Sequence, residues 1–205
     1  MARKAKPQTL SGENVRKATF DLALSVGWQH VTMSDIAEKS GISLGDLLKL
    51  YRSKSAIVRA YIDNLDEQML GSIQAASTET HRDRLFDILM SRFDALNPDK
   101  EAFLCILRCD SRDPLTTICH LFRLKRSLSL MLEAAGLSSS GIIGQIRLKG
   151  LGLVYANAFR VWLNDDSTDM AKTMAALDQS LAKAEKIATL CRAKSPSAEP
   201  QETTS

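Results

Sequence analysis

The chain has 205 residues, of which 44% are hydrophobic, so it is long enough to bury a core and too apolar to be disordered throughout. Its 10 glycines, 5 prolines and 5% aromatic residues supply too few turn signals for a sandwich or barrel of many strands. We therefore predict an all-α fold. The net charge of +3 is uneven, because residues 1–60 hold ten basic and five acidic side chains. This basic segment favours a polyanionic partner, although a chance imbalance is the alternative interpretation.

Apolar residues recur at helical spacing through the middle of the chain. The first predicted helix ends near Gly27, and its inner face is expected to consist of Val15, Ala18, Leu22 and Val26. Further helices are expected at about 34–40, 45–51, 54–74, 85–97, 103–113, 115–135, 139–164 and 167–191. The two long final helices are joined by a short turn.

The two ends of the chain are predicted to be tails. Residues 1–11 are expected to form a flexible basic tail, and residues 193–205, which are rich in Ser, Thr, Pro and Glu, a disordered one. No apolar run has the length of a signal peptide or a membrane span. The four cysteines show no disulfide-framework spacing. We therefore expect a cytoplasmic protein with reduced thiols.

Two short helices are punctuated by strong capping signals. Thr32 and Asp35 form a T-x-x-D capping pair, and Ser43 and Asp46 repeat the spacing before the next helix. Between them, Gly41 can adopt the left-handed conformation that ends a helix and reverses the chain. Two capped helices joined by a tight glycine turn are typical of the helix-turn-helix, whose second helix enters the DNA major groove. An ordinary helical hairpin is the alternative that the spacing allows.

These residues, together with their neighbours, resemble the signature of the TetR-type transcriptional regulators. The matching positions are Thr32, Asp35, Ile36, Ala37, Ser40, Gly41, Ile42, Ser43, Gly45, Tyr51, Ser53 and Lys54. The resemblance implies a three-helix DNA-binding domain over 12–53. It also implies a ligand-binding and dimerisation domain of about five to six helices over 54–192. The implied function is a homodimeric regulator of transcription, a repressor, that binds double-stranded DNA and is controlled by a small hydrophobic effector.

Position by position, the resemblance also implies which residues contact DNA. They are Thr32, Ser43, Leu44, Gly45, Lys49, Tyr51 and Lys54. The chain departs from the family at Leu48 and Leu50, where aromatic or histidine side chains are usual, and at Asp46, where threonine is frequent. The recognition helix therefore has neither Arg nor Asn for bidentate base readout, and Leu44 can meet only a thymine methyl.

A second resemblance covers about residues 84–187, and the residues that carry it lie in the last two predicted helices. The stretch from Arg147 through Trp162, Asp165 and Thr173 to Leu181 is similar to the lipid-binding proteins of ubiquinone biosynthesis, which share the TetR-like fold. This resemblance implies that the body holds a long apolar ligand. It also supplies the alternative function, a lipid-binding protein without DNA recognition.

Apolar residues of the middle helices are candidates for lining a ligand pocket, although plain core packing explains any one of them equally well. They are Phe86, Leu89, Phe93, Phe103, Leu107, Phe122 and Met131. A run of small residues, from Gly141 to Ala158, suits a dimer interface through the last two long helices, with internal packing as the alternative.

The remaining reactive and charged residues favour ordinary structural roles. Cys105 and Cys109 lie four apart, and Cys119 precedes His120, but small buried thiols explain them better than metal or redox chemistry. The basic residues Arg123, Lys125 and Arg126 are expected on a solvated helix face, with the anchoring of an acidic ligand as the alternative. We expect no catalytic residues, no metal site and no cofactor, because no nucleophile, base or phosphate loop stands at a functional spacing.

Overall fold

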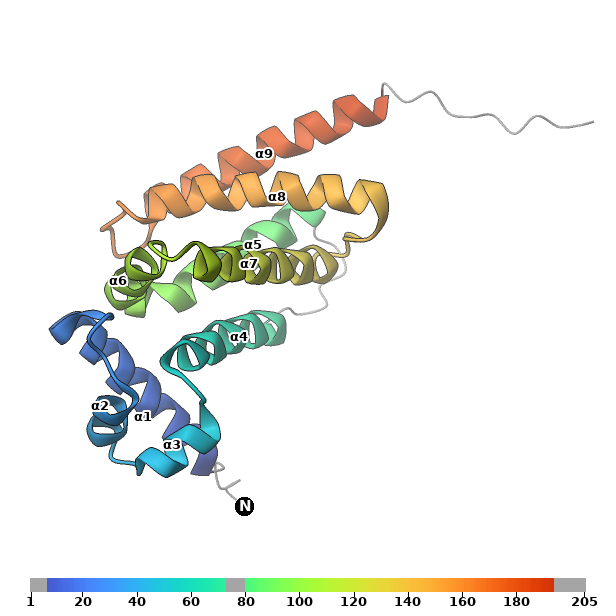
Figure 1. The fold of residues 1–205 in the computed structure, drawn as a ribbon. Helices are drawn as coiled ribbons and strands as arrows, with labels where there is room; N and C mark the ends of the chain where they lie inside the picture. Colours follow the sequence, from blue (N-terminus) through green and yellow to red (C-terminus); the bar gives the residue numbers. More distant parts are fainter. Residues whose placement is uncertain (1–6, 73–79, 194–205) are drawn as a thin grey trace, which may run out of the picture. The chain divides into compact units, whose positions relative to one another are not determined.

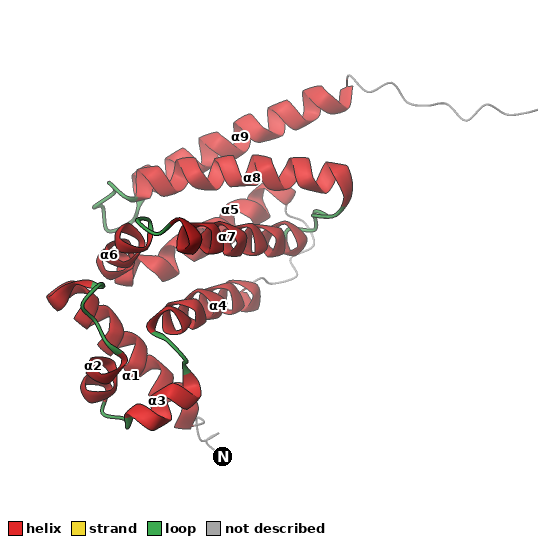
Figure 2. Ribbon diagram, viewed as in Figure 1, coloured by secondary structure: helices red, strands yellow, loops and turns green. Residues whose placement is uncertain are grey.

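The computed structural model describes residues 7–72 and 80–193, and in these ranges every regular element is a helix (Figures 1 and 2). The elements are α1 (Pro7–Leu22), the π-helical turn η1 (Ala23–Gly27), α2 (Met33–Ser40), α3 (Leu44–Leu50), α4 (Lys54–Ser72), α5 (His81–Leu96), the 3-10 turn η2 (Asn97–Asp99), α6 (Lys100–Asp110), α7 (Pro114–Ala134), α8 (Gly141–Trp162) and α9 (Ala171–Ala193). The predicted all-α fold is therefore confirmed. None of the helices over the described ranges is long and apolar enough to cross a membrane.

The helix boundaries follow the predicted ones closely, with one correction at the start of the chain. The helix α1 begins at Pro7, inside the segment predicted to be a tail. Proline is favoured in the first turn of a helix, because its φ is already helical and its missing N–H has no partner there anyway. The rest of that predicted tail, residues 1–6, and residues 194–205 of the C-terminal one lie outside the described residues.

The chain divides into two compact units. The first comprises residues 1–75 and 91–127, and the second comprises 76–90 and 128–205. Helices α5 and α7 each contribute residues to both units. The first unit contains the whole of the predicted DNA-binding domain, together with α4, α6 and parts of α5 and α7. The predicted functional boundaries, 12–53 and 54–192, stay predictions.

The first unit has a core in which α1 packs against α2 and α4. Its most completely buried apolar side chains include Val15, Phe20, Ile36, Leu47, Ile57, Leu65 and Met69. The rings of Phe20 on α1 and Tyr61 on α4 meet edge to face, with centroids 4.9 Å apart, which is a favourable aromatic geometry. Helix α1 therefore packs on α4, and the two share part of the core of this unit.

The π-helical turn η1 changes which residues of the first helix face the core. The prediction that Val26 is buried is wrong, since this side chain is 50% exposed. A π-helical turn holds more residues than an α-helical turn, so the buried position moves along the chain. Ala23 and Trp28, five residues apart, are the buried ones.

A buried ion pair ties α4 to α5 inside the first unit. The Arg92 guanidinium pairs with the Asp66 carboxylate, and both residues are buried. The second oxygen of Asp66 accepts a hydrogen bond of 2.5 Å from the hydroxyl of Ser127 on α7. Because buried charges are tolerated only when they are paired and hydrogen-bonded, this group specifies how α4, α5 and α7 pack.

The second unit is built on the antiparallel helices α8 and α9, which run side by side in Figure 1. Trp162 and Leu177 are fully buried between them, and the Asn157 amide donates a 2.9 Å hydrogen bond to the Ser180 hydroxyl. This hydrogen bond between the Asn157 side chain of α8 and the Ser180 side chain of α9 adds a polar contact to the apolar packing of the two helices.

The turn between α8 and α9 is organised by one buried carboxylate, that of Asp165. It accepts hydrogen bonds from the backbone N–H and the hydroxyl of Thr173, both at 2.8 Å, and from the hydroxyl of Ser167 at 2.5 Å. Burial raises the pKa of Asp165, but these hydrogen bonds outweigh it and hold the pKa well below its usual range. Asp165 is therefore ionised in the folded chain.

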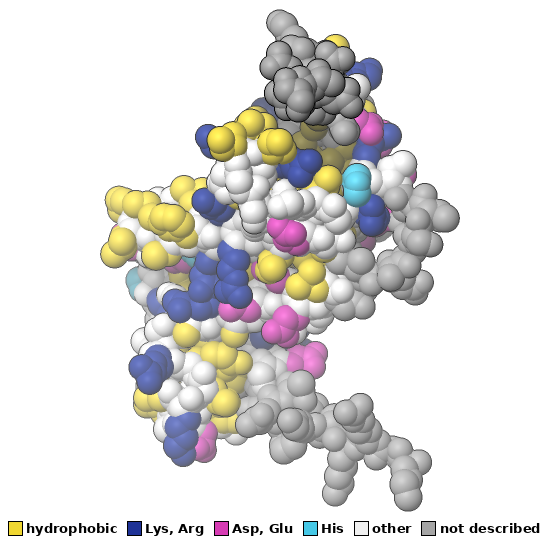
Figure 3. Space-filling model, turned by 90° about the vertical axis from the view of Figure 1, so that its right-hand side faces the viewer, with side chains coloured by type: hydrophobic (Ala, Val, Ile, Leu, Met, Phe, Trp, Pro, Cys, Tyr) yellow, Lys and Arg dark blue, Asp and Glu magenta, His cyan; other side chains and the backbone are white. Residues whose placement is uncertain are grey.

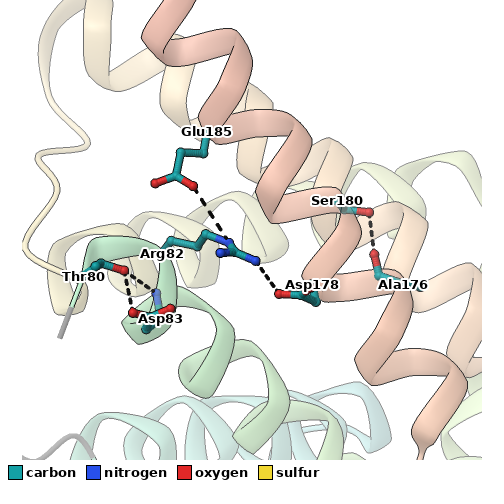
Figure 4. Close-up of polar contacts among 7 residues, drawn as sticks. All are labelled: Thr80, Arg82, Asp83, Ala176, Asp178, Ser180 and Glu185. Atoms are coloured by element: carbon teal, nitrogen blue, oxygen red, sulfur yellow. Dashed lines mark hydrogen bonds and ion pairs between the residues drawn. The ribbon is translucent and has the colours of Figure 1, made fainter.

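Arg82 links α5 to α9 within the second unit (Figure 4). Its guanidinium donates to the Asp178 carboxylate and lies 4.0 Å from the Glu185 carboxylate, two turns further along α9. Thr80 and Asp83 cap the start of α5 through reciprocal hydrogen bonds of 3.2 and 2.7 Å. The cap places Arg82 at the first turn of α5, where it reaches both acidic residues.

Candidate nucleic-acid interface

The start of α2 is set by a capping box. The Thr32 hydroxyl oxygen accepts a hydrogen bond of 3.2 Å from the Asp35 N–H, and the Asp35 carboxylate accepts one of 2.9 Å from the Thr32 N–H. Hydrogen bonding of the Asp35 carboxylate to the Thr32 side chain and then to the Thr32 backbone lowers the pKa of Asp35, because these bonds stabilise the ionised form. Thr32 and Asp35 thus fix the N-terminus of α2, where Thr32 is exposed.

Gly41 ends α2 and turns the chain toward α3. Its φ of 72° lies in the left-handed region that favours glycine, and the Ile42 N–H bonds back to the Ala37 carbonyl at 3.1 Å. Since a side chain in this conformation is strained, the tight reversal requires glycine. The turn brings Ser43 to the start of α3 after only two residues.

The first turn of α3 holds a three-residue polar chain. Ser43 Oγ accepts from the Asp46 N–H at 3.1 Å and donates to the Asp46 carboxylate at 2.7 Å. The other oxygen of Asp46 accepts from Lys49 Nζ at 2.9 Å. The Lys49 ammonium and then the Ser43 hydroxyl lower the pKa of Asp46, and Asp46 in turn raises the pKa of Lys49. Asp46 thus partly neutralises the cation nearest the proposed DNA surface.

The outer face of α3 is largely apolar. Leu47 is fully buried and fixes the helix to the core, whereas Leu44, Leu48 and Leu50 are 40%, 43% and 45% exposed. Gly45 adds no side chain between them, and a Cβ there would meet only the Ser43 hydroxyl, at 3.8 Å. The exposed face therefore offers contact with thymine methyl groups and close backbone approach, but few hydrogen bonds to bases.

Lys54, a predicted phosphate contact, also makes contacts inside the first unit. Its Nζ donates hydrogen bonds to the carbonyls of Trp28 at 2.6 Å and Val31 at 3.1 Å, and it lies 4.7 Å from the centre of the Trp28 ring. A lysine ammonium has three donors, so at most one remains for DNA. Lys54 therefore acts as a positioning residue for the segment that leads into α2, and its phosphate contact stays a prediction.

The predicted DNA contacts fall into two groups. Ser43 caps α3, Leu44 and Gly45 begin it, and Lys49 lies in its last turn; all four are exposed. Tyr51 ends α3, where its N–H bonds to the Leu47 carbonyl at 2.7 Å, and its side chain is half-buried. The structure thus brings the α3 residues together on one surface and draws Lys54 inward.

A hydrogen-bonded group that the sequence did not reveal supports the segment before α2. The Trp28 indole N–H donates to one oxygen of Asp110 at 2.9 Å, and His120 Nε2 lies 3.0 Å from the other. These residues come from the ends of η1 and α6 and from α7, so 82 positions separate Trp28 from Asp110. Sequence spacing carries no signal for a contact of this kind.

The candidate pocket residues differ in burial and belong to both units. Leu89 and Met131 are fully buried in the second unit, and Phe93 and Phe103 are buried in the first. Phe86 and Leu107 are half-buried. Phe122 is 68% exposed on α7, an exposure that does not suit a residue lining a pocket. The ligand contacts of these residues stay predictions.

The first unit does contain a cavity, of about 780 Å³, between α1 and α4. Tyr61 and the paired side chains of Arg16 and Asp99 line it, and none of the seven predicted pocket residues does. Burial and then the charge of Asp99 raise the pKa of Tyr61, so its phenol stays protonated at neutral pH. This cavity was not expected from the sequence, because its lining residues come from segments distant in the chain.

The small residues of α8 differ in what surrounds them, and their role in a dimer stays a prediction. A Cβ on Gly144 would lie 2.2 Å from the backbone of Ser139, so internal packing requires this glycine. A Cβ on Gly150, in contrast, would meet nothing within 4 Å. Beside it, α8 and α9 expose apolar side chains: Ile142, Ile143, Ile146, Leu153, Ile187 and Leu190 are 62% to 83% exposed.

The thiol of Cys105 packs inside the first unit, where Sγ donates to the Ala23 carbonyl at 3.3 Å. Cys109 is half-buried and Cys119 is exposed. This arrangement agrees with the structural interpretation of Cys105, since a buried thiol acts as a small apolar group and a weak donor.

No protein-family model and no curated protein matches the chain. Several solved structures do match it in fold. A TetR transcriptional regulator from Nitrosomonas europaea is 21% identical, with a TM-score of 0.73 over 85% of this chain and 98% of that one. A TetR regulator from Rhodococcus sp. RHA1 is 19% identical, with a TM-score of 0.61 over 87% and 97%.

A third structure is FadR from Thermus thermophilus, a TetR-family repressor solved in complex with lauroyl-CoA. It is 17% identical, with a TM-score of 0.50 over 94% of this chain and 100% of that one. At these identities the likeness is one of fold. The chain therefore has the all-α fold of the TetR-family transcriptional regulators.

Proposed function

We propose that this chain is a DNA-binding transcriptional regulator that acts as a repressor. The observation that carries the proposal is the pair α2–α3, two capped helices joined at Gly41, of which the second turns an exposed face outward. A helix so placed enters the major groove with its N-terminal turn, while the preceding helix crosses the phosphate backbone. The fold shared with the TetR regulators supports the same assignment.

Contacts with the DNA backbone come from groups at the two helix starts. Thr32 and the first amides of α2 face one phosphate, because helix N-termini attract anions. Lys49 and Arg52 are exposed and add salt-dependent contacts. Sequence preference then rests on Leu44 and on DNA shape rather than on hydrogen-bonded readout.

We further propose that the chain forms a two-fold dimer through α8 and α9. Their exposed isoleucines and leucines would be covered in such a dimer, and Gly150 allows the helices to approach closely. Two DNA-binding domains would then occupy half-sites about 34–36 Å apart, roughly one turn of DNA.

The proposed effector is a small hydrophobic molecule bound in the helical body. FadR, of the same fold, was solved with an acyl-CoA, which supports this ligand class. The residues proposed to contact the ligand are Phe86, Leu89, Phe93, Phe103, Leu107 and Met131. Binding would change the separation of the two DNA-binding domains and so release the operator.

The proposal is tested by gel-shift and fluorescence-anisotropy binding of the purified full chain to DNA flanking its own gene. We expect binding whose affinity falls steeply as salt rises from about 50 to 200 mM, because backbone contacts release counterions. A folded chain that binds no promoter-proximal sequence at any salt concentration would refute the proposal.

Replacing Asp46 with Asn is expected to tighten DNA binding. The change removes a carboxylate from the surface that faces phosphates and frees Lys49 from its ion pair, while the amide can still meet the Ser43 hydroxyl. The plot of log affinity against log salt should steepen by about 1, the change expected for one added phosphate contact. The neighbouring Glu38→Gln, an exposed acidic change on α2, is the control. An unchanged slope for Asp46→Asn would contradict the assignment.

Lys49→Met and Lys54→Met are expected to have opposite effects. Lys54 loses two internal hydrogen bonds from a charged donor, so the free energy of unfolding should fall by about 2 kcal/mol. Lys49 bonds only a surface carboxylate, so its replacement should leave the urea midpoint unchanged but weaken DNA binding. Urea titration and anisotropy on both variants check the assignment, and equal stability of the two would show that Lys54 is not a positioning residue.

A second candidate function is lipid binding without DNA recognition. The observation that favours it is the set of exposed leucines on α3, of which Leu48 and Leu50 stand where the family usually has aromatic or histidine side chains. Native mass spectrometry of the purified chain distinguishes the two functions. A co-purified isoprenoid together with no DNA binding supports the lipid carrier, whereas tight DNA binding by a ligand-free chain supports the regulator.

A further inference from the structure

The first half of α7 presents an apolar face that nothing in the first unit covers. Leu115, Ile118, Leu121 and Phe122 are 69%, 49%, 61% and 68% exposed. At about 100° per residue, these four positions occupy about one third of the helix circumference. Scattered exposed leucines are ordinary on a protein surface, but four large apolar side chains on two successive turns form a patch that needs a partner.

Basic side chains adjoin this patch. Lys125 and Arg126 are exposed and continue the same face of α7 one turn further on, and Arg112 is exposed just before the helix. Burial, and then the neighbouring charges of Arg59 and Arg126, lower the pKa of Arg123. Several positive charges therefore lie close together beside the apolar patch. Hydrophobic and basic side chains lie next to each other on the face in Figure 3.

The acidic side chains at this end of α7 are already engaged. Asp113 accepts hydrogen bonds from the Leu115 N–H at 3.1 Å and the Thr116 hydroxyl at 2.5 Å. Asp110 is bonded to Trp28 and His120, and Asp63 lies 3.6 Å from Arg123. The exposed patch therefore offers its partner apolar surface and positive charge together.

The combination of apolar surface and positive charge distinguishes between the possible partners of this face. DNA would satisfy the arginines but leave the four apolar side chains without a contact. A second copy of this face would bring its own Lys125 and Arg126 into the same contact, so the positive charges of the two faces would add. With exposures above 60%, Leu115, Leu121 and Phe122 form a ridge rather than a groove for another helix. A ridge of this composition is typical of segments that lie in the interface of an anionic membrane.

We propose that the first half of α7 docks on anionic phospholipid membranes. Leu115, Ile118 and Phe122 enter the boundary between headgroups and acyl chains, and Lys125 and Arg126 meet the lipid phosphates. The helix lies along the surface and does not span it. This docking goes beyond DNA binding and does not depend on it, because it uses α7 and none of the residues assigned to the DNA interface.

The experiment is co-sedimentation of the full chain with vesicles of phosphatidylcholine containing about one third phosphatidylglycerol, and with vesicles of phosphatidylcholine alone. We expect binding to the anionic vesicles that weakens with salt, and at least about tenfold weaker binding to the neutral ones. Two double variants test the face: Leu115→Ser with Phe122→Ser, and Lys125→Glu with Arg126→Glu. Both change exposed side chains, so folding should be preserved, and circular dichroism checks it.

The matched control is Leu24→Ser with Val26→Ser, which removes exposed apolar side chains from η1, outside both the proposed dimer interface and the proposed DNA interface. Each α7 variant should lose vesicle binding about tenfold, while the η1 variant keeps it. No binding of the natural chain to anionic vesicles would overturn the proposal, as would equal losses in all variants. A change in the sedimentation mass of the α7 variants would overturn it in favour of a second copy. Gel shifts with the α7 variants should be unchanged, so failure of membrane docking and failure of DNA binding are distinguishable.

Discussion

Replacing Arg92 with Met is expected to lower the free energy of unfolding by about 3–5 kcal/mol, the largest effect of any single change considered for this chain. Arg92 and Asp66 are 5% and 8% exposed, so the substitution leaves a buried carboxylate with the Ser127 hydroxyl as its remaining partner. A buried charge without a counter-ion lowers the free energy of unfolding far more than the loss of the attraction between the two ions does by itself. Urea unfolding followed by circular dichroism measures the change.

Two further variants distinguish the effect of an unpaired buried charge from the effect of shortening an arginine side chain. The double variant Asp66→Leu with Arg92→Met removes both charges and should recover most of the lost stability, because an apolar pair of similar size fills the same space. Arg123→Met breaks a surface pair with Asp63 at 3.6 Å in the same unit and should cost no more than about 1 kcal/mol. Equal losses for Arg92→Met and Arg123→Met would show that the Asp66 carboxylate is not desolvated in solution.

Asp165→Ala is expected to lower the free energy of unfolding by about 3 kcal/mol. The change removes hydrogen bonds accepted by a charged group and leaves the buried N–H and hydroxyl of Thr173 without their acceptor. Because Asp165 joins α8 to α9, the same variant should weaken the proposed dimer. Urea unfolding gives the stability, and sedimentation equilibrium gives the dimer dissociation constant. Asp169→Ala, at an exposed position of the same turn, should cost about 1 kcal/mol or less.

The contribution of Asp165 also depends on pH in a defined direction. Its pKa is lowered in the folded chain, so the unfolded chain binds the proton first as the pH falls. The stabilisation is therefore complete above about pH 5 and declines below about pH 4, the ordinary range of an aspartate, toward the depressed folded pKa. The difference between the natural chain and Asp165→Ala should shrink over this interval. A difference that stays constant down to pH 3 would show that Asp165 is not ionised in the fold.

The helix-turn-helix, α2 and α3, was the part of the molecule most accessible from sequence. The capping box at Thr32 and the turn at Gly41 have the predicted geometry, and Ser43 caps α3 as predicted, although the Asp46 carboxylate bonds the Ser43 hydroxyl and not its N–H. These features can be predicted from sequence because each one depends on hydrogen bonds between residues no more than four or five positions apart. Distant parts of the chain have little influence on them. The exposure of Leu48 likewise follows from the burial of Leu47, since successive helical positions point in different directions.

The functional side chains were harder to place. Lys54 stands where a phosphate contact was expected, yet its long flexible stem reaches the carbonyls of Trp28 and Val31, which only the fold brings within range. Phe122 fits the pattern of a pocket residue, but it lies on an uncovered face of α7. Local pattern specifies that a side chain is apolar or cationic, and it does not specify which neighbours surround it.

The excess of basic residues at the start of the chain shows what the sequence determines and what only the tertiary structure determines. The sequence by itself determined the all-α fold, the helix-turn-helix and the excess of basic residues before residue 60, because these depend on composition and short-range spacing. The tertiary structure alone decided how those charges are used: Asp46 holds Lys49, the Trp28 and Val31 carbonyls hold Lys54, and Arg59 joins the basic residues of α7. The reason is physical, since long charged side chains take whichever partner the packed helices bring within a few ångströms.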